Sequence, residues 1–402
     1  MVLTIQKFSI PFGQLGTFTV QKFPMSKRRR RFSVALPLAL VALAAAMPAW
    51  AQDYQPGSVL SGYMDFHLNK PEFEDARLDF HRFVLLFTHS FGDRLRFVGE
   101  LELEHAFVEG FEESGELELE QAYLDFLLTR GFNLRAGMLL APVGIINERH
   151  EPPVYYGVER PFLDTVIVPS TWFDAGAGVH GEIGRGFRYR AYVMSPLNAA
   201  EFSAGEGVRG GRQKGGEANV GRPAVTGRFE WVGHPGLTVG ASAWTGRSGF
   251  EFRPRFDVPV TLAEADVRYA PTDRLEVRAQ FAQVFVDNAG DLNDALTRRI
   301  GVNPNVARSM RGFYLESGYR VVAASPAGEV GVFLRYENFD TQHRMPDGYV
   351  PLPQFDRDAW TFGATFWPDP DVAVKIDYTV LRSRSAVIEA PDSFNVGLGW
   401  WF

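Results

Sequence analysis

Short segments of alternating polarity follow one another from residue 58 to the C-terminus, and the gaps between them alternate between short and long. A strand that crosses a bilayer at a tilt needs roughly 9–11 residues, with one face toward lipid and the other toward a wet lumen. Transmembrane barrels have tight connections at one end and long connections at the other, whereas a soluble β-sandwich has no reason to keep that order. About sixteen such segments are present, so we predict an all-β fold, a transmembrane antiparallel β-barrel.

The connections between the expected strands show the alternation clearly. The turn at Arg130-Gly131 is tight, and the next connection, 141–171, is the longest well-formed insertion. The last strand ends on Phe402, and a terminal aromatic of this kind resembles the closing strand of bacterial outer-membrane barrels. We expect strands near 59–67, 78–89, 95–107, 117–128, 132–140, 173–183, 187–194, 224–232, 237–245, 260–269, 275–286, 313–322, 330–339, 360–366, 372–381 and 393–402.

The side-chain phase of these segments separates a charged face from an apolar face. Along 95–103, Leu101 and Leu103 fall on one face of a strand, and Glu100 and Glu102 fall on the other. Barrels of about eight strands fill their interior with side chains, whereas around sixteen strands leave an aqueous channel. We therefore expect a pore. Its wall should carry Arg96, Arg135, Arg188, Arg190, Arg228, Arg278, Arg335 and Lys375.

The N-terminal part of the chain has the features of a targeting segment. Residues 25–51 have a basic start at 27–31, an apolar stretch and a small-x-small cleavage pattern at Ala49-Trp50-Ala51, which together predict a secretory signal peptide. A membrane anchor is the alternative, but the apolar run is shorter than the ~18 residues that a membrane helix needs. The mature barrel would span 52–402, and residues 1–24 would be a mis-called N-terminal extension.

Charge and composition limit the classes of molecule that the chain is expected to bind. Residues 1–51 hold seven of the 41 basic residues and none of the 48 acidic ones, so the formal charge of the mature chain is near −14, which argues against nucleic acid as a partner. Beyond residue 51 the lysines are Lys70, Lys214 and Lys375, so nearly all positive charge is arginine, which suits fixed contacts with oxyanions. The absence of cysteine suits an exported protein.

A motif around the longest insertion resembles the phosphate-selective porin O and P family of Gram-negative outer-membrane porins. The matching residues, within 133–183, are Arg135-Ala136-Gly137, Pro142-Val143-Gly144, Glu148, Glu159-Arg160, Pro169, Trp172, Asp174, Gly176, Gly178 and Gly181. Met138 stands where the family often has lysine, and Pro-Val-Gly replaces the commoner Pro-Phe-Gly. The resemblance implies a homotrimer of barrels within outer-membrane lipid, each with an inward-folded third extracellular loop that narrows its pore.

The long insertion carries the residues that we expect at this constriction. Its prolines stiffen the backbone, so it can hold a fixed position, and charges that line a constriction set ion selectivity. The expected constriction residues are Glu148, Arg149, His150, Glu151, Glu159 and Arg160. The alternative is a solvated external loop whose charges have no special role.

The expected function is passive diffusion of small hydrophilic solutes and ions across the cell outer membrane, without a cofactor or an enzymatic step. The wall arginines favour anions, with phosphate as a candidate solute, although carboxylates such as Glu230 and Asp377 could pair with them and the negative net charge opposes this preference. The alternative is a sugar- or organic-acid-selective channel, in which Tyr155, Tyr156 and Trp172 would form a stacking slide.

Other classes of function have weaker signals. His67, His81, His89 and His105 lie on early strands without metal-ligand spacing, so we predict no metal site. The Gly- and Arg-rich segment 205–216 lacks a phosphate-loop pattern and is expected to be a mobile external loop. A barrel enzyme remains an alternative, although the sequence has no Gly-x-Ser-x-Gly elbow. An adhesion barrel would need a plug or closed packing.

Overall fold

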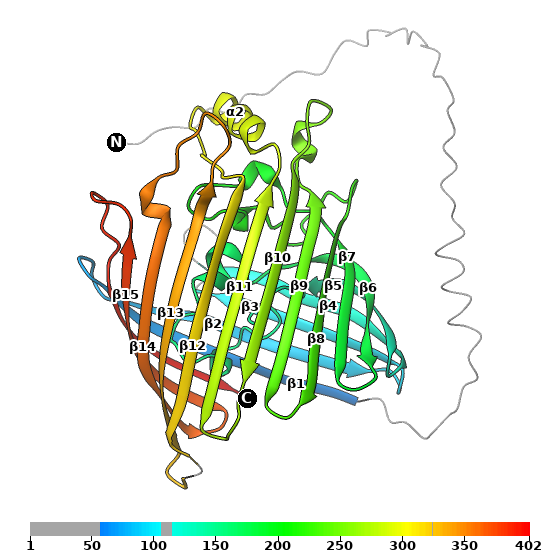
Figure 1. Ribbon diagram of the computed structural model, residues 1–402. Helices are drawn as coiled ribbons and strands as arrows, with labels where there is room; N and C mark the ends of the chain where they lie inside the picture. The colour runs from blue at the N-terminus through cyan, green and yellow to red at the C-terminus, as the bar shows by residue number, and fades with distance from the viewer. Residues whose placement is uncertain (1–56, 106–114, 324) are drawn as a thin grey trace, which may run out of the picture. The chain divides into compact units, whose positions relative to one another are not determined.

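Sixteen antiparallel strands close into a barrel in the computed structural model, which describes residues 57–105, 115–323 and 325–402. Each strand pairs with its neighbours in the chain, and β1 pairs with β16 to complete the cylinder (Figure 1). The predicted fold class is therefore confirmed. The predicted N-terminal extension and signal peptide lie outside the described residues, as do the first residues of the expected mature chain, 52–56.

Most predicted strand bounds agree with the structure to within a few residues. The strands are β1 (Gly57–Pro71), β2 (Arg77–Ser90), β3 (Leu95–Glu104), β4 (Glu116–Thr129), β5 (Phe132–Leu140), β6 (Phe173–Ile183), β7 (Phe187–Met194), β8 (Ala224–His234), β9 (Leu237–Arg247), β10 (Pro259–Tyr269), β11 (Leu275–Val286), β12 (Ser309–Val322), β13 (Glu329–Arg344), β14 (Asp356–Asp369), β15 (Val372–Ser383) and β16 (Ser393–Trp401). The differences are largest at β1, which extends beyond both predicted ends, and at β13 and β14, which extend further toward the long connection between them than their alternation predicts.

The two ends of the barrel differ in their connections. Turns such as 130–131, 235–236 and 370–371 follow the even-numbered strands, and the longer connections follow the odd-numbered strands. Short helical turns occur within the long connections at Pro152–Val154, Leu163–Ile167, Ala199–Glu201, Arg209–Gly211, Phe250–Phe252 and Pro353–Phe355. The barrel therefore has a turn end and a long-connection end, as its sequence predicts.

The seam between the first and last strands depends on a glycine. The backbone of Gly62 exchanges two hydrogen bonds with Phe402, with N···O distances of 3.0 and 2.9 Å. A Cβ atom at residue 62 would lie 2.1 Å from the carbonyl oxygen of Val84 and 2.7 Å from the Phe402 ring. Only glycine therefore allows the chain end to lie this close to β1 and β2.

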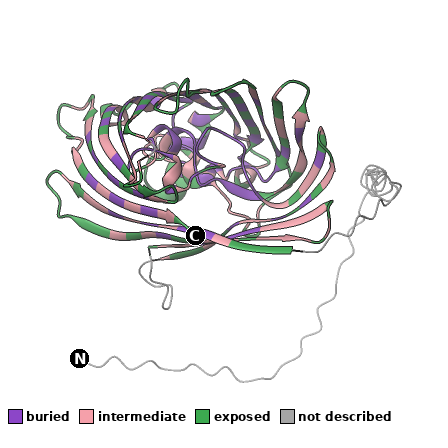
Figure 2. Cartoon of the chain, turned by 90° about the horizontal axis from the view of Figure 1, so that it is seen from below, coloured by how far each residue is buried: buried purple, intermediate pink, exposed green. Residues whose placement is uncertain are grey.

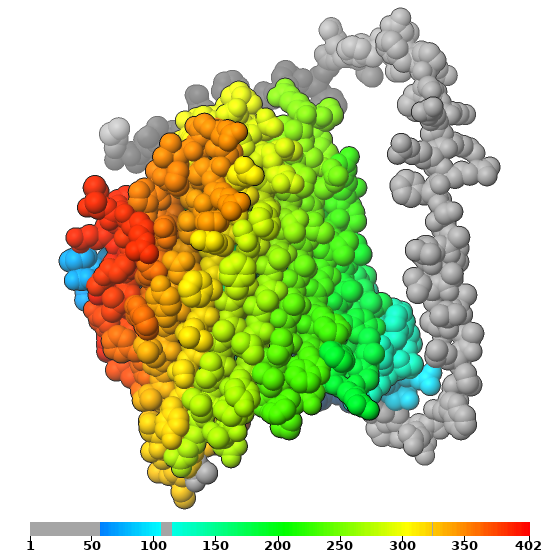
Figure 3. All heavy atoms as spheres, viewed as in Figure 1, coloured from blue at the N-terminus to red at the C-terminus, as the bar shows by residue number. Residues whose placement is uncertain are grey.

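The outer and inner faces of the strands have opposite polarity, as the predicted phase requires. Leu101 and Phe229 are exposed on the outside, whereas Glu100, Glu102 and Arg228 are buried toward the lumen. The strands β8 to β14 form a continuous wall on the side seen in Figure 3, and its exposed apolar side chains include Phe229, Phe281, Phe313, Leu334 and Trp360. Exposed apolar surface of this extent is what a strand presents to lipid. Among the described residues, no helix is long and apolar enough to cross a membrane.

Part of the interior is a packed apolar core near the long-connection end. Lumen-facing side chains of β8 to β13, such as Trp244 and Leu262, are buried together with residues from the connections 141–172 and 195–223. The rings of Trp172 and Trp244 lie 5.2 Å apart. A view along the barrel shows buried chain crossing its interior (Figure 2). The core of this barrel is therefore made by its own long connections.

The connection between β11 and β12 differs from the expectation. The sequence predicts a loop over 287–308, but α2 (Ala289–Ile300) lies within it. Leu292 and Leu296 share one face of α2 and are buried in the interior core. The helix ends at Gly301, which adopts a left-handed conformation with φ of 75°. A four-residue apolar spacing followed by glycine is a helix signal.

Candidate pore and its constriction loop

The connection between β5 and β6, residues 141–172, crosses the interior and is called here the constriction loop. Its backbone amides reach lumen-facing side chains on distant strands. The amide of Gly144 donates to Ser242 Oγ on β9 at 3.2 Å, and that of Leu163 donates to Glu337 Oε2 on β13 at 3.1 Å. The loop is therefore attached to the barrel wall, which differs from the alternative of a solvated external loop.

Lys375 on β15 forms the densest of these attachments. Its ammonium donates to the carbonyl oxygens of Pro152, Tyr155 and Gly157, at 2.5, 2.6 and 2.8 Å. The side chain is buried, and its nitrogen lies 4.1 Å from the centre of the Tyr155 ring. Lys375 faces the lumen as predicted. However, its three donors are all engaged, so it holds the loop in place instead of guiding solutes.

The fixed shape of the loop begins with Asn147. Its side-chain amide donates to the carbonyl oxygens of Ala141 and Trp172, at 2.7 and 2.9 Å, and its carbonyl oxygen accepts from the Trp172 amide at 2.7 Å. Asn147 is fully buried, so these bonds join the two ends of the loop away from solvent. A buried amide with three satisfied hydrogen bonds rigidifies the segment around it.

The predicted constriction residues lie around two cavities instead of a single ring. Glu148 and Arg149 line a small cavity of about 80 Å³ together with wall arginines near the turn end. Glu159 and Arg160 line a larger cavity of about 490 Å³ toward the long-connection end. The remaining two, His150 and Glu151, line neither cavity.

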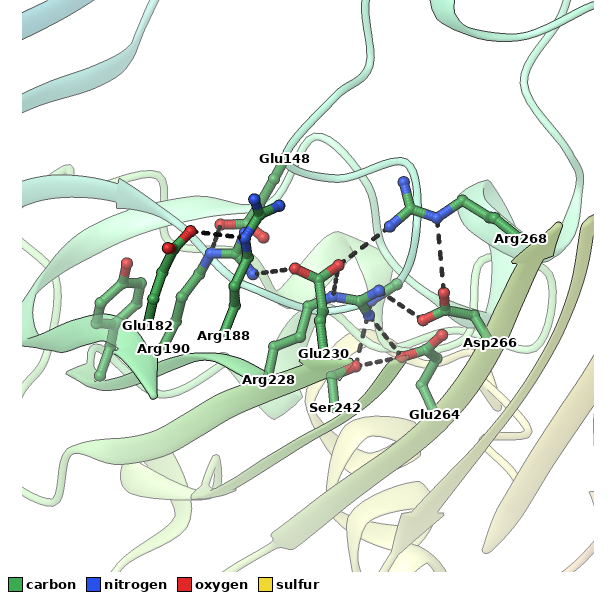
Figure 4. A network of polar contacts seen from close by, with 12 residues as sticks. Glu148, Glu182, Arg188, Arg190, Arg228, Glu230, Ser242, Glu264, Asp266 and Arg268 are labelled. Carbon is green, nitrogen blue, oxygen red and sulfur yellow. Dashed lines mark hydrogen bonds and ion pairs between the residues drawn. The ribbon is translucent and has the colours of Figure 1, made fainter. Parts of the chain in front are cut away.

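The predicted wall arginines are engaged in ion pairs. Arg228, for example, is buried and contacts Glu230, Glu264 and Asp266 at 3.1, 3.2 and 2.6 Å (Figure 4). The other pairs are Arg96–Asp125, Arg135–Asp125, Arg188–Glu182, Arg190–Glu148, Arg190–Glu230, Arg278–Glu276, Arg278–Glu316, Arg335–Glu316 and Arg335–Glu337. Carboxylates on the same strand, on nearby strands and on the constriction loop therefore neutralise much of the positive charge of the wall arginines.

Two further arginines come from the Gly- and Arg-rich segment 205–216, whose composition predicts a mobile external loop. Arg209 donates to the carbonyl oxygen of Ser170, and Arg212 donates to those of Ser170 and Thr171. Phe202 and Val208 in the same connection are buried in the interior core. The expectation of a mobile external loop is therefore wrong, because apolar residues beside the glycines dock the segment against the constriction loop.

The stacking slide of the alternative hypothesis is also absent from the described part of the chain. Tyr155, Tyr156 and Trp172 are 2%, 5% and 1% exposed, so their ring faces are covered by protein. Tyr156 stacks on Phe333 at 5.8 Å, and Trp172 contacts Trp244. These aromatic rings anchor the loop and leave no face for a sugar.

The packing of the loop also affects Asp164, a titratable group within it. It is fully buried, and one carboxylate oxygen accepts a hydrogen bond from Gln280 Nε2 at 3.0 Å. Burial disfavours the charged carboxylate and raises the pKa of Asp164 to about 8, and the nearby Glu337 and Asp266 act in the same direction. Near neutral pH, the loop therefore carries a carboxyl group that stays largely protonated.

Comparison with known structures supports this architecture. The anion-selective porin from Comamonas acidovorans is 12% identical, with a TM-score of 0.56 over 87% of this chain and 100% of that one. The outer-membrane channel DcaP of Acinetobacter baumannii is 12% identical, with a TM-score of 0.58 over 89% and 100%. A trimer form of OmpT, an outer-membrane protein of Vibrio cholerae, is 12% identical, with a TM-score of 0.54 over 86% and 99%. At these identities the likeness shows a shared fold.

Sequence comparison identifies the family. No protein-family model matches the chain. A protein of Aquifex aeolicus (strain VF5), described as uncharacterized, is 36% identical over 387 residues, which cover 93% of this chain and 87% of that protein. The chain therefore belongs to the same family as this Aquifex aeolicus protein, and its barrel has the fold shared by the porins and channels above.

Proposed function

We propose that the protein is an outer-membrane porin that allows passive diffusion of small hydrophilic solutes and ions and prefers anions. The apolar outer wall suits lipid, and the charged lumen suits water. The shared fold with an anion-selective porin and other outer-membrane channels supports the same class of function. The long connections would then face the cell exterior, and the turns would face the periplasm.

The observation that carries the anion preference is a set of unpaired guanidinium groups on the two interior loops. Arg149, Arg160 and Arg209 line the lumen cavities, and none of them forms an ion pair with a carboxylate in the described part of the chain. The wall arginines, in contrast, are paired. Glu148 and Glu159 line the same cavities, but Glu148 is paired with Arg190 at 3.2 Å and Glu159 contacts His67 at 3.0 Å. Charges that line a lumen act on passing ions at close range, so the three unpaired guanidinium groups favour anions.

Solute selectivity follows from the same groups. A guanidinium presents parallel N–H donors that match the oxygens of phosphate, so inorganic phosphate is the first solute to titrate. The resemblance to the phosphate-selective porin O and P family supports this choice. The scarcity of lysine beyond residue 51 distinguishes this chain from that family's usual pattern.

Reversal potential in a planar bilayer tests the proposal. Purified barrels under a KCl gradient should give discrete current steps with an anion-signed potential. Arg149→Glu combined with Arg160→Glu should move that potential toward cation preference. Arg130→Glu is the matched control, because Arg130 is highly exposed at the β4–β5 turn and lines neither lumen cavity. We expect it to leave the reversal potential nearly unchanged.

Each outcome has a distinct meaning. A cation-signed potential in the parent protein would be consistent with a porin but would reject the anion preference. An unchanged potential in the double variant would place Arg149 and Arg160 off the conducting path. Silence from correctly folded barrels would reject the porin itself. Phosphate that fails to reduce chloride current at millimolar concentration would remove phosphate as a preferred solute.

We also propose that the barrels form homotrimers, on the basis of the implied family and the trimer form of one structural neighbour. Native mass spectrometry in mild detergent should show three chains per particle. A single mass corresponding to one chain, obtained under conditions that preserve a known trimeric porin, would contradict this assembly.

A further inference from the structure

A buried cluster of carboxylates lies beside the constriction loop, on the wall formed by β3 and β4. Glu100 and Glu102 come from β3, Glu120 comes from β4, and His150 comes from the loop. All four are at most 3% exposed. Three carboxylates at this depth need compensating positive charge, because an unpaired buried charge is costly.

The donor atoms converge as metal ligands do. His150 Nε2 lies 3.0 Å from Glu120 Oε2 and 3.9 Å from Glu100 Oε1. One potential ligand atom from each of Glu100, Glu120 and His150 lies within 4.8 Å of the other two. Ligands that bind Zn²⁺ tetrahedrally at about 2.0–2.1 Å are roughly 3.3 Å from one another. The observed separations fall on either side of that value, so small side-chain movements would complete the site.

The orientation of His150 is a separate observation that favours a ligand. Its Nδ1 lies 3.1 Å from the carbonyl oxygen of Asn147, the residue that joins the two ends of the loop. With Nδ1–H donating to that carbonyl, the Nε2 lone pair points toward the carboxylates. Metal-binding histidines are held in this way by a backbone or carboxylate acceptor behind the ring.

The carboxylate oxygens also have unused acceptor capacity. Glu120 is fully buried, and neither of its oxygens accepts a hydrogen bond from a described residue, despite the short approach to His150. Glu102 Oε1 is likewise buried and without a donor among the described residues. Gln121 donates to Glu100, which leaves one oxygen of that carboxylate for another partner. Buried acceptors of this kind normally have partners.

We propose that Glu100, Glu120 and His150 bind a divalent first-row transition-metal ion of the Zn²⁺ type. One imidazole nitrogen with carboxylate oxygens suits such an ion better than Ca²⁺ or Mg²⁺, which prefer oxygen alone. The ion would attach the constriction loop to β3 and β4, whereas Lys375 attaches it to β15. The site does not depend on the proposed anion preference, because its ligands are buried between loop and wall.

A second group of residues provides a control. Asp79, His81 and His105 also bring three donor atoms within 4.8 Å, but they are more exposed, and both histidines contact the same carboxylate oxygen. A hydrogen-bonded carboxylate explains that arrangement without an ion. His105→Gln should therefore leave tight metal binding intact.

Calorimetric titration of Zn²⁺ into the purified, EDTA-dialysed barrel tests the proposal. We expect one tight equivalent per chain. Glu120→Gln keeps the side-chain shape without its charge and should weaken binding at least tenfold, and His150→Gln should do the same. His105→Gln should retain the tight equivalent. Absence of tight binding in the parent barrel, or its loss only in His105→Gln, would overturn the assignment.

Locating the bound ion in the unmodified barrel tests the proposal even if the variants fail to fold. Crystals of the unmodified barrel grown with Zn²⁺ should give an anomalous peak between Glu120 and His150. A peak at His81 and His105 alone, or no peak at stoichiometric Zn²⁺, would reject the site. Both measurements report binding without conductance, so they are independent of whether the barrel is an anion-preferring porin.

Discussion

Replacing Lys375 by methionine should release the constriction loop from β15. The ammonium makes three hydrogen bonds to loop carbonyls in a buried position. Hydrogen bonds to charged groups contribute about 1.5–3 kcal/mol each, so the gross interaction is of order 5–9 kcal/mol. Burial of the ammonium opposes it by several kcal/mol. A net loss of about 3 kcal/mol follows, which corresponds to roughly a hundredfold shift toward the detached loop.

Thiol labelling can measure that shift, because the chain contains no cysteine. A single cysteine at Val158, which is fully buried beside Lys375's carbonyl partners, should react slowly when the loop is docked. In Lys375→Met the labelling rate should rise by about two orders of magnitude, since it reports the population of the open loop. Lys214→Met is the matched control, because Lys214 contacts Glu116 and Glu118 on β4 instead.

The outcome that would refute this reasoning is an equal labelling rate in the parent and in Lys375→Met, with both barrels folded. The loop would then be held by its other contacts, such as the amide of Val158 on Asp377 at 2.6 Å. Equal acceleration in Lys214→Met would show that any loss of a lysine loosens the barrel.

Three further predictions concern stability. Asp164→Asn should be more stable than the parent protein at pH 8, because the raised pKa of Asp164 means that the parent loses stability as pH rises from about 4 to about 8. Thermal unfolding across that range should show the difference in stability between variant and parent widening with pH. A difference that stays constant with pH would contradict this prediction. Asn147→Ala should lower the free energy of unfolding by about 2–4 kcal/mol, since it removes three buried hydrogen bonds, and unchanged thermal unfolding would contradict this. Gly62→Val should reduce the yield of folded barrel in a refolding assay, whereas Gly57→Val, where a Cβ meets open space, should refold normally.

Local alternation is sufficient to predict most of the barrel. A strand that crosses a membrane must repeat its polarity every two residues, and this alternation can be recognised in the sequence without knowing which strand lies beside it. For this reason the predicted bounds of β5, β6, β7 and β11 match the structure to the residue. The helix α2 escapes prediction because its apolar spacing is short and lies in a connection, where alternation gives no information.

The candidate site is predictable only in part. Phase alone predicts which face of a strand an arginine occupies, and accordingly Arg228, Arg278 and Arg335 are buried and Arg188 and Arg190 line a lumen cavity. The carboxylates with which these arginines pair are decided by strand register. The approach of Arg228 to Asp266 on β10, for example, depends on the register of the strands between them. The segment 205–216 differs from its prediction because its glycine content resembles a mobile loop, while its docking depends on a core that exists only when the barrel closes.

The sequence by itself therefore determined the strands, their facing and the long insertion after β5. Tertiary structure alone decided what that insertion contacts. Lys375 and Gly157 are far apart in the chain, as are His150 and Glu100, and no local pattern links them. Closure of the barrel brings these residues together, because lumen-facing side chains of strands distant in sequence surround one enclosed loop.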